Sequence, residues 1–181
     1  MDLIRSVNPL TLAAGTIFIV LFSWFLSVKH GRYHGIARFF AFESVFIMVL
    51  LNSEIWFNDP FSLLQIISWI LLLLSIWFAI AGFILLRNLG KPKGGNFENT
   101  SVIVKTGLYK YIRHPLYLSI LVGGTGVMLK DPGSIQLILG VINLAAIWFT
   151  ARIEEREMIS KFGVAYSDYM KETKMFIPFI L

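Results

Sequence analysis

The chain has 181 residues, of which 56% are hydrophobic and 15% are charged, and its mean hydropathy is +0.72. Because roughly 25% of residues are charged in soluble domains, this composition excludes a large soluble catalytic domain and indicates a protein of the lipid bilayer. The sequence contains no cysteine, which excludes disulfides, a thiolate nucleophile and cysteine-ligated metals.

Five long apolar segments predict transmembrane helices, since a helix needs about 20 mostly apolar residues to cross about 30 Å of hydrocarbon. In chain order the segments span residues 10–28, 39–57, 61–86, 115–129 and 135–151. The last two are short, and the turn-forming residues Lys-Asp-Pro-Gly at 130–133 separate them, so we expect them to form a helical hairpin.

Basic residues concentrate on one side of these segments. Of the sixteen Lys and Arg residues, only Arg5 and Lys130 fall on the other side. The positive-inside rule therefore predicts an outside N-terminus and a cytoplasmic C-terminus. The net charge of +5 and the pI near 9.6 are then anchors at a membrane face rather than a nucleic-acid site.

The resulting prediction is an all-α integral membrane protein forming a single membrane domain over residues 1–181. Its two long polar stretches are a cytoplasmic loop at residues 87–114 and a cytoplasmic C-terminal segment at residues 152–181. Because a hairpin brings its two ends together, residues 109–117 are expected beside residues 152–157. The candidate site is therefore cytoplasmic.

Pro115 stands where the fourth helix is expected to begin. Proline is favoured at the first helical position, and the free N–H groups of that turn attract a carboxylate or phosphate. His114 and Arg113 flank this position, while Tyr109 and Tyr117 offer an aromatic face to a purine or a cation. The alternative is that these residues are only interfacial anchors.

Acidic residues follow the fifth segment. Helical spacing places Arg152, Glu155 and Arg156 on one face and Glu154 on another. This pattern fits either an intrahelical salt-bridge ladder or an acidic wall of a site. Beside the basic start of the fourth helix, an acidic wall would suit a ligand that carries both signs of charge.

Two carboxylates lie in the second apolar segment, Glu43 and Glu54. A charged group inside a membrane is expensive, so both are functional candidates. Glu43 comes about one helical turn after Arg38 and could pair with it, whereas Glu54 could simply lie near the outer interface. The histidines are not at ligand spacing, so we expect no metal site.

The C-terminal half resembles the isoprenylcysteine carboxyl methyltransferase family and the related membrane phospholipid methyltransferases. The residues that carry the resemblance are Gly107-x-Tyr109, Arg113-His114-Pro115-x-Tyr117, Glu154-Glu155, Phe162-Gly163-x-x-Tyr166-x-x-Tyr169 and Ile177-Pro178. The chain departs from many relatives in having Ser119 where they have glycine.

The resemblance implies an enzyme that binds S-adenosylmethionine at the cytoplasmic face, between the hairpin and the C-terminal segment. The residues that it assigns to the cofactor are Val102, Ile103, Val104, Tyr109, His114, Pro115, Leu116, Tyr117, Glu154 and Glu155. Arg152 is expected to orient a substrate carboxylate.

The chemistry expected is in-line methyl transfer, which needs alignment and the exclusion of water rather than a metal. A carboxylate acceptor is already ionised, so Arg152 would only position it. An amine acceptor would need a base, for which Glu155 or Glu43 are the candidates. The acceptor is expected to be a lipophile that enters from the bilayer between the early segments and the hairpin.

Carboxyl methylation of an isoprenylcysteine-like substrate is the first expectation for the acceptor. Methylation of phospholipid amines or small thiols is the alternative. Two rivals from other classes are a membrane reductase that uses NADPH, because sterol-type reductases share an Arg-His-Pro region, and a non-enzymatic membrane scaffold. The expected partners are membrane lipids and a lipophilic substrate, not nucleic acid.

Overall fold

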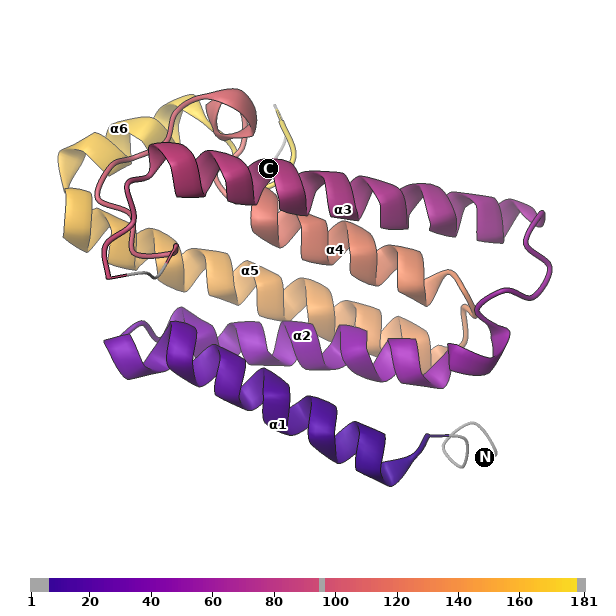
Figure 1. Ribbon diagram of the computed structural model, residues 1–181. Helices are drawn as coiled ribbons and strands as arrows, with labels where there is room; N and C mark the ends of the chain where they lie inside the picture. The colour runs from indigo at the N-terminus through magenta and orange to yellow at the C-terminus, as the bar shows by residue number, and fades with distance from the viewer. Residues whose placement is uncertain (1–6, 95–96, 179–181) are drawn as a thin grey trace.

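The computed structural model describes residues 7–94 and 97–178, and helices dominate this part of the chain (Figure 1). The α-helices are α1 (Pro9–Leu26), α2 (His34–Leu51), α3 (Leu63–Leu89), α4 (Pro115–Met128), α5 (Ser134–Phe162) and α6 (Val164–Glu172). The described residues form no strand, and their one isolated bridge joins Ile112 to Lys174.

Four helical segments are long and apolar enough to cross a membrane, namely Pro9–His30, His34–Leu51, Leu63–Leu89 and Ser134–Phe162. The all-α integral membrane class predicted from the sequence is therefore confirmed. Helix α4 has 14 residues and is about 21 Å long at 1.5 Å per residue. It is shorter than the hydrocarbon layer that a spanning helix has to cross.

The long helices lie side by side along a common direction (Figure 1). Helix α4 packs against α3, α5 packs against α2 and α4, and α1 packs against α2. Helix α6 lies at the end of the bundle where α3 and α5 carry their C-termini, so the polar segments gather at this end.

Helices α2 and α5 differ most from the predicted apolar segments, and α2 also ends at Leu51 instead of Phe57. Helix α2 begins at His34 instead of Phe39, because the buried side chains of His34 and Arg38 find polar partners. Helix α5 continues past Ala151 to Phe162 without a break. The polar residues after Ala151 are good helix formers, and the helix ends only at Gly163, whose φ is 60°.

Helices α3 and α4 approach each other closely through small residues. The Ser75 hydroxyl donates to the Ser119 carbonyl at 2.9 Å, and the Ser68 hydroxyl donates to the Gly126 carbonyl at 2.7 Å. A Cβ atom at Gly123 would lie 2.6 Å from Ser75 Oγ. Small residues therefore set the distance between the two helices, as is common in membranes.

A polar cluster closes the opposite end of the bundle. Lys130, which the sequence assigns to the side opposite most basic residues, is only 4% exposed. Its ammonium group donates to Gln65 Oε1 at 3.0 Å and lies 3.7 Å from the centre of the Trp69 ring. Asn52 donates to the Val127 carbonyl at 2.8 Å. These contacts fix the turn that joins α4 to α5.

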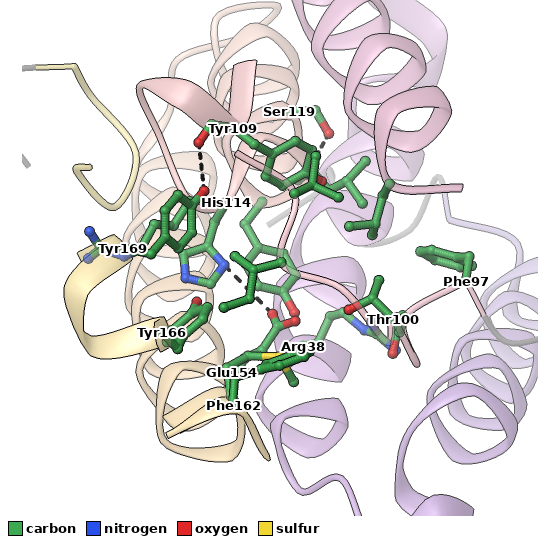
Figure 2. Close-up of a pocket in the computed structure, with 18 of the residues that line it drawn as sticks. Arg38, Phe97, Thr100, Tyr109, His114, Ser119, Glu154, Phe162, Tyr166 and Tyr169 are labelled. Atoms are coloured by element: carbon green, nitrogen blue, oxygen red, sulfur yellow. Dashed lines mark hydrogen bonds and ion pairs between the residues drawn. The ribbon is translucent and has the colours of Figure 1, made fainter. Parts of the chain in front are cut away.

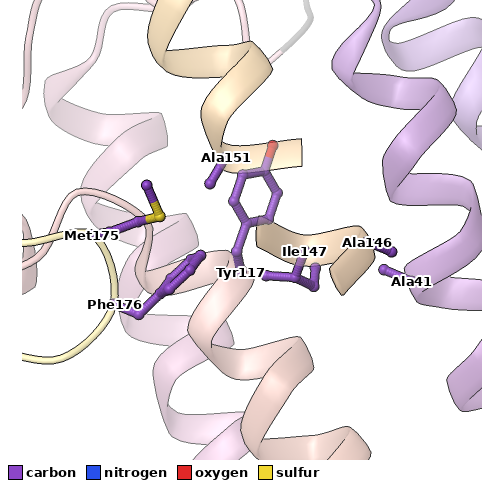
Figure 3. Packing of buried hydrophobic residues seen from close by; sticks show 7 residues of the cluster. All are labelled: Ala41, Tyr117, Ala146, Ile147, Ala151, Met175 and Phe176. Carbon is purple, nitrogen blue, oxygen red and sulfur yellow. The ribbon is translucent and has the colours of Figure 1, made fainter. Parts of the chain in front are cut away.

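The segment after α6 returns to the start of α4. The Arg113 N–H donates to the Lys174 carbonyl at 2.8 Å, and the His114 N–H donates to the Met175 carbonyl at 3.2 Å. Met175 and Phe176 then join a buried cluster around Tyr117 (Figure 3). The remaining members of this cluster are Ala41, Ala146, Ile147 and Ala151. The start of α4 is thus held from both sides.

Candidate functional site

A cavity of about 240 Å³ lies between α2, α4, α5, α6 and the loop that follows α3 (Figure 2). It contains most of the residues that the resemblance assigned to a cofactor. Those that line it are Val102, Ile103, Val104, Tyr109, His114, Leu116, Tyr117 and Glu154, whereas Pro115 and Glu155 are not among its lining residues. The loop after α3, the start of α4 and the second half of α5 thus line one cavity.

Helix α4 begins at Pro115, with His114 as its N-cap. The His114 side chain is 6% exposed, and its ring stacks on the Tyr117 ring with centroids 5.3 Å apart. Its Nε2 atom is buried and lies 3.5 Å from Glu155 Oε1, which is longer than a good hydrogen bond. His114 also lines the cavity, so its ring is placed to contact a ligand there.

Glu155 forms a buried ion pair with Arg113. It is 2% exposed, and its Oε1 atom lies 2.7 Å from both Nε and Nη2 of Arg113. The same guanidinium donates to the Thr173 carbonyl, and at 3.3 Å to the Met170 carbonyl. The pair therefore joins α5, the start of α4 and the C-terminal segment.

Glu154 is the acidic residue that lines the cavity. Its Oε2 atom lies 3.7 Å from His114 Nδ1 (Figure 2). Its Oε1 atom lies 3.6 Å from Arg32 Nη2. The resemblance favoured Glu155 over Glu154 as the residue that contacts the cofactor. In the structure Glu155 contacts Arg113 and Glu154 lines the cavity, because neighbouring positions on a helix point about 100° apart.

Three candidates lie away from the cavity lining. The Arg152 side chain is 52% exposed, with its guanidinium 5.4 Å from the Trp148 ring centre and 3.6 Å from Glu155. Glu43 accepts a hydrogen bond from Thr16 Oγ1 at 2.6 Å, where α2 contacts α1. Glu54 is exposed in the 3₁₀ turn Ser53–Ile55. The substrate roles expected of Arg152 and Glu43 stay predictions.

A buried charged cluster adjoins the cavity and was missed by sequence reasoning. Arg38 and Glu98, which are 4% and 8% exposed, both line the cavity and are hydrogen-bonded to each other. Ser27 Oγ accepts from Arg38 Nη2 at 2.8 Å and donates to Glu98 Oε2 at 2.9 Å. Glu98 also lies 3.5 Å from Arg32 and from His34. The cluster anchors the loop after α3 to α2.

The ionisation of Glu98 follows from this surrounding. Burial alone would raise the pKa of the Glu98 carboxyl group, but the hydrogen bonds and charges of His34 and Arg38 lower this pKa to about 2. Glu98 is thus a carboxylate at neutral pH. The one sequence signal for the cluster was the charge of Arg38 next to an apolar segment.

Tyrosines form the wall on the side of α6. Tyr166 and Tyr169 line the cavity, and Tyr169 donates from its hydroxyl to the Tyr109 carbonyl at 2.7 Å. Burial raises the pKa of all three phenols. The wall is therefore aromatic and uncharged at neutral pH.

A second and more open cavity of about 460 Å³ is lined by residues of α1, α2, α3 and α4. Its lining is apolar except for Ser75 and Ser119, and it includes Val45, Phe46 and Leu72. The residues that line both cavities are Phe22, Phe42, Ser119 and Ile120. A mixed polar and aromatic site is thus adjacent to an apolar one inside the membrane-spanning region.

Comparison with known proteins places residues 63–165, which contain α3, α4 and α5, in the family model described as phospholipid methyltransferase. Methanethiol S-methyltransferase 2 of Bradyrhizobium diazoefficiens is 35% identical over 71 residues, which is 39% of this chain and 27% of that protein. No solved structure matches the chain.

Two further relatives carry the name protein-S-isoprenylcysteine O-methyltransferase. The protein of Saccharomyces cerevisiae is 37% identical over 89 residues, which is 46% of this chain and 35% of that protein. The protein of Rattus norvegicus is 33% identical over 138 residues, which is 65% of this chain and 47% of that protein. The chain thus spans less than half the length of each of these three relatives.

Proposed function

The chain belongs to the phospholipid methyltransferase family, whose model matches more than half of it, and from this premise we propose that it methylates a lipophilic acceptor with S-adenosylmethionine. The motif resemblance to isoprenylcysteine carboxyl methyltransferases is confirmed by the relatives that carry this name. Carboxyl methylation of an isoprenylcysteine-like lipid is accordingly the first candidate reaction.

The residues of the polar cavity fit S-adenosylmethionine, which carries a carboxylate, an ammonium group and a purine. His114 lines the cavity, with its buried Nε2 atom 3.5 Å from Glu155 Oε1, and suits the carboxylate. Glu154 lines the cavity and suits the ammonium group, and the wall of Tyr109, Tyr166 and Tyr169 suits the purine. When bound, the cofactor supplies an electrophilic methyl group: an acceptor lone pair bonds to the methyl carbon while the carbon–sulfur bond breaks and its electrons stay on sulfur.

The observation that supports a lipophilic acceptor is the apolar cavity of about 460 Å³ beside the polar one. Phe22, Phe42 and Ile120 line both, so an apolar chain held in the second cavity would end at the first. A small thiol, the substrate type named for the Bradyrhizobium relative, would leave this space unfilled. The size of the cavity therefore favours a long-chain acceptor over a small one.

The membrane arrangement belongs to the same proposal. We place one membrane domain over residues 1–181, with α4 and α5 as a hairpin that completes five spans, an outside N-terminus and a cytoplasmic cavity. Support comes from the Lys and Arg residues that surround the cavity end, whereas Lys130 lies at the opposite end. Arg5, the other residue expected outside, lies beyond the described residues.

Calorimetry on the protein purified in detergent tests the cofactor. We expect S-adenosylmethionine to bind, and His114→Ala to weaken that binding by about tenfold or more, since the free energy of a hydrogen bond to a charged group is lost. The thermal midpoint of the variant should stay close to that of the wild type. Binding of NADPH in place of S-adenosylmethionine would overturn the proposal in favour of a reductase.

Transfer of a labelled methyl group to a panel of lipids tests the acceptor. The panel contains farnesyl thioethers that end in a carboxylate, farnesyl thioethers that end in an amine, phospholipids and methanethiol. We expect the long-chain thioethers to be methylated in preference to methanethiol. A preference for methanethiol would contradict the role given to the apolar cavity.

A further inference from the structure

Arg38 lies where the two cavities meet. Arg38 lines the polar cavity, and its guanidinium carbon is 5.7 Å from the Phe22 ring centre and 5.9 Å from the Phe42 ring centre. Both rings line the apolar cavity as well. The side chain is 4% exposed and belongs to the first turns of α2, inside a candidate span. A charge at such a position is costly unless it is used.

One nitrogen of this guanidinium has no hydrogen-bond partner among the described residues. Nη1 donates to Glu98, and Nη2 donates to Ser27 Oγ at 2.8 Å. The third nitrogen, Nε, is buried and has no hydrogen-bond partner among the residues that the structure describes. Because a buried donor without an acceptor costs free energy, an acceptor supplied by a ligand would stabilise the site.

We propose that Arg38 is the residue that binds the polar end of the methyl acceptor, and that this end is a carboxylate. The inference rests on the proposed function and assigns to Arg38 the positioning role that sequence reasoning gave to Arg152. Arg152 is half-exposed and lies outside the cavity lining, whereas Arg38 is buried at the point where an apolar chain would emerge.

The free donor selects between acceptor chemistries. A carboxylate has two oxygens, so one can accept the Nε hydrogen of Arg38 while the other presents its lone pair to the methyl group. A neutral amine has a single lone pair, which the reaction uses, and its remaining polar atoms are N–H donors. Arg38 would then face donor with donor, which disfavours an amine.

The matched experiment changes two arginines that share Glu98. Arg38→Lys keeps a cation near Glu98 but removes the Nε–H group. Arg32→Lys makes the same change in a residue that lies 3.5 Å from Glu98 but does not line the cavity. The probes are a farnesyl thioether that ends in a carboxylate and the same thioether that ends in a primary amine. Their dissociation constants are measured with S-adenosylhomocysteine bound.

We expect the wild type to bind the carboxylate probe about ten- to a hundredfold more tightly than the amine probe, the range for a hydrogen bond to a charged group. Arg38→Lys should abolish most of this preference, and Arg32→Lys should keep it. An equal loss in both variants would assign Arg38 to anchoring Glu98 only and overturn the inference, as would a wild type that prefers the amine.

The proposed function is tested separately in the same samples. Binding of S-adenosylhomocysteine to the wild type reports on the cofactor site, and its absence would count against the methyltransferase proposal itself. Binding of the cofactor product together with an unchanged carboxylate preference in Arg38→Lys would overturn only the role of Arg38.

Discussion

Arg113 and Arg152 offer a test of the site geometry, because both pair with Glu155 but in different surroundings. The Arg113 side chain is 8% exposed and that of Glu155 is 3% exposed, with 2.7 Å between their charged atoms. Replacing Arg113 by Gln leaves a buried carboxylate without its main partner. Such a loss costs about 3–5 kcal/mol.

Arg152→Gln is the matched control. Its side chain is 52% exposed, and the guanidinium lies 3.6 Å from Glu155 on the adjacent turn of the same helix. Exposed ion pairs contribute about 0–1 kcal/mol, because water screens them and long side chains lose entropy. The same substitution opposite the same glutamate should therefore differ by about 3 kcal/mol between the two positions.

Thermal unfolding in detergent, followed by tryptophan fluorescence, measures this difference. At about 2–4 °C per kcal/mol for a chain of this size, Arg113→Gln should lower the midpoint by about 6–20 °C, and Arg152→Gln by about 4 °C at most. Equal midpoints for the two variants would refute the burial argument. A large loss of methyl transfer in Arg152→Gln alone, at unchanged stability, would restore its predicted substrate role.

Three further outcomes are expected. Glu98, with a pKa of about 2 against an ordinary 4.5, contributes stability above pH 4.5 that is lost as the pH falls from 4.5 towards 2. The loss of about 3 kcal/mol should be absent in Glu98→Gln, measured by unfolding midpoints across pH. Val45→Trp fills the apolar cavity and should raise the dissociation constant of a farnesyl thioether about tenfold while cofactor affinity stays unchanged; Val20→Trp, on an exposed position of α1, is its control. Gly123→Ala brings a methyl group within 2.6 Å of Ser75 Oγ and should lower the free energy of unfolding by about 1–3 kcal/mol.

Local signals in the sequence predicted a large part of this arrangement. Pro115 marked the start of α4 because proline fits the first helical turn. The turn at residues 130–133 brought the ends of α4 and α5 together, and Arg113 indeed contacts Glu155. Each of these inferences depended on residues close in sequence or on one simple connection.

The parts of the site that depend on contacts between distant residues could not be predicted from the sequence. Arg38 and Glu98 are separated by the whole of α3 and pair only because the loop after α3 folds back onto α2. Glu154 lines the cavity, whereas Glu155 contacts Arg113. Neighbouring positions on a helix differ by about 100°, so composition alone leaves that choice open.

The two arginines that line the polar cavity show how a structural role differs from a binding role in one site. The donors of Arg113 are taken up by Glu155 and by the carbonyls of Met170 and Thr173, all within the protein. Arg38 has Glu98 and Ser27 as partners but keeps Nε unpaired among the described residues. A guanidinium has five N–H donors in a rigid plane, so the nitrogen that the fold leaves without a partner is the one that a ligand can use. The Arg38 guanidinium lies beside Phe22 and Phe42, which line both the polar and the apolar cavity.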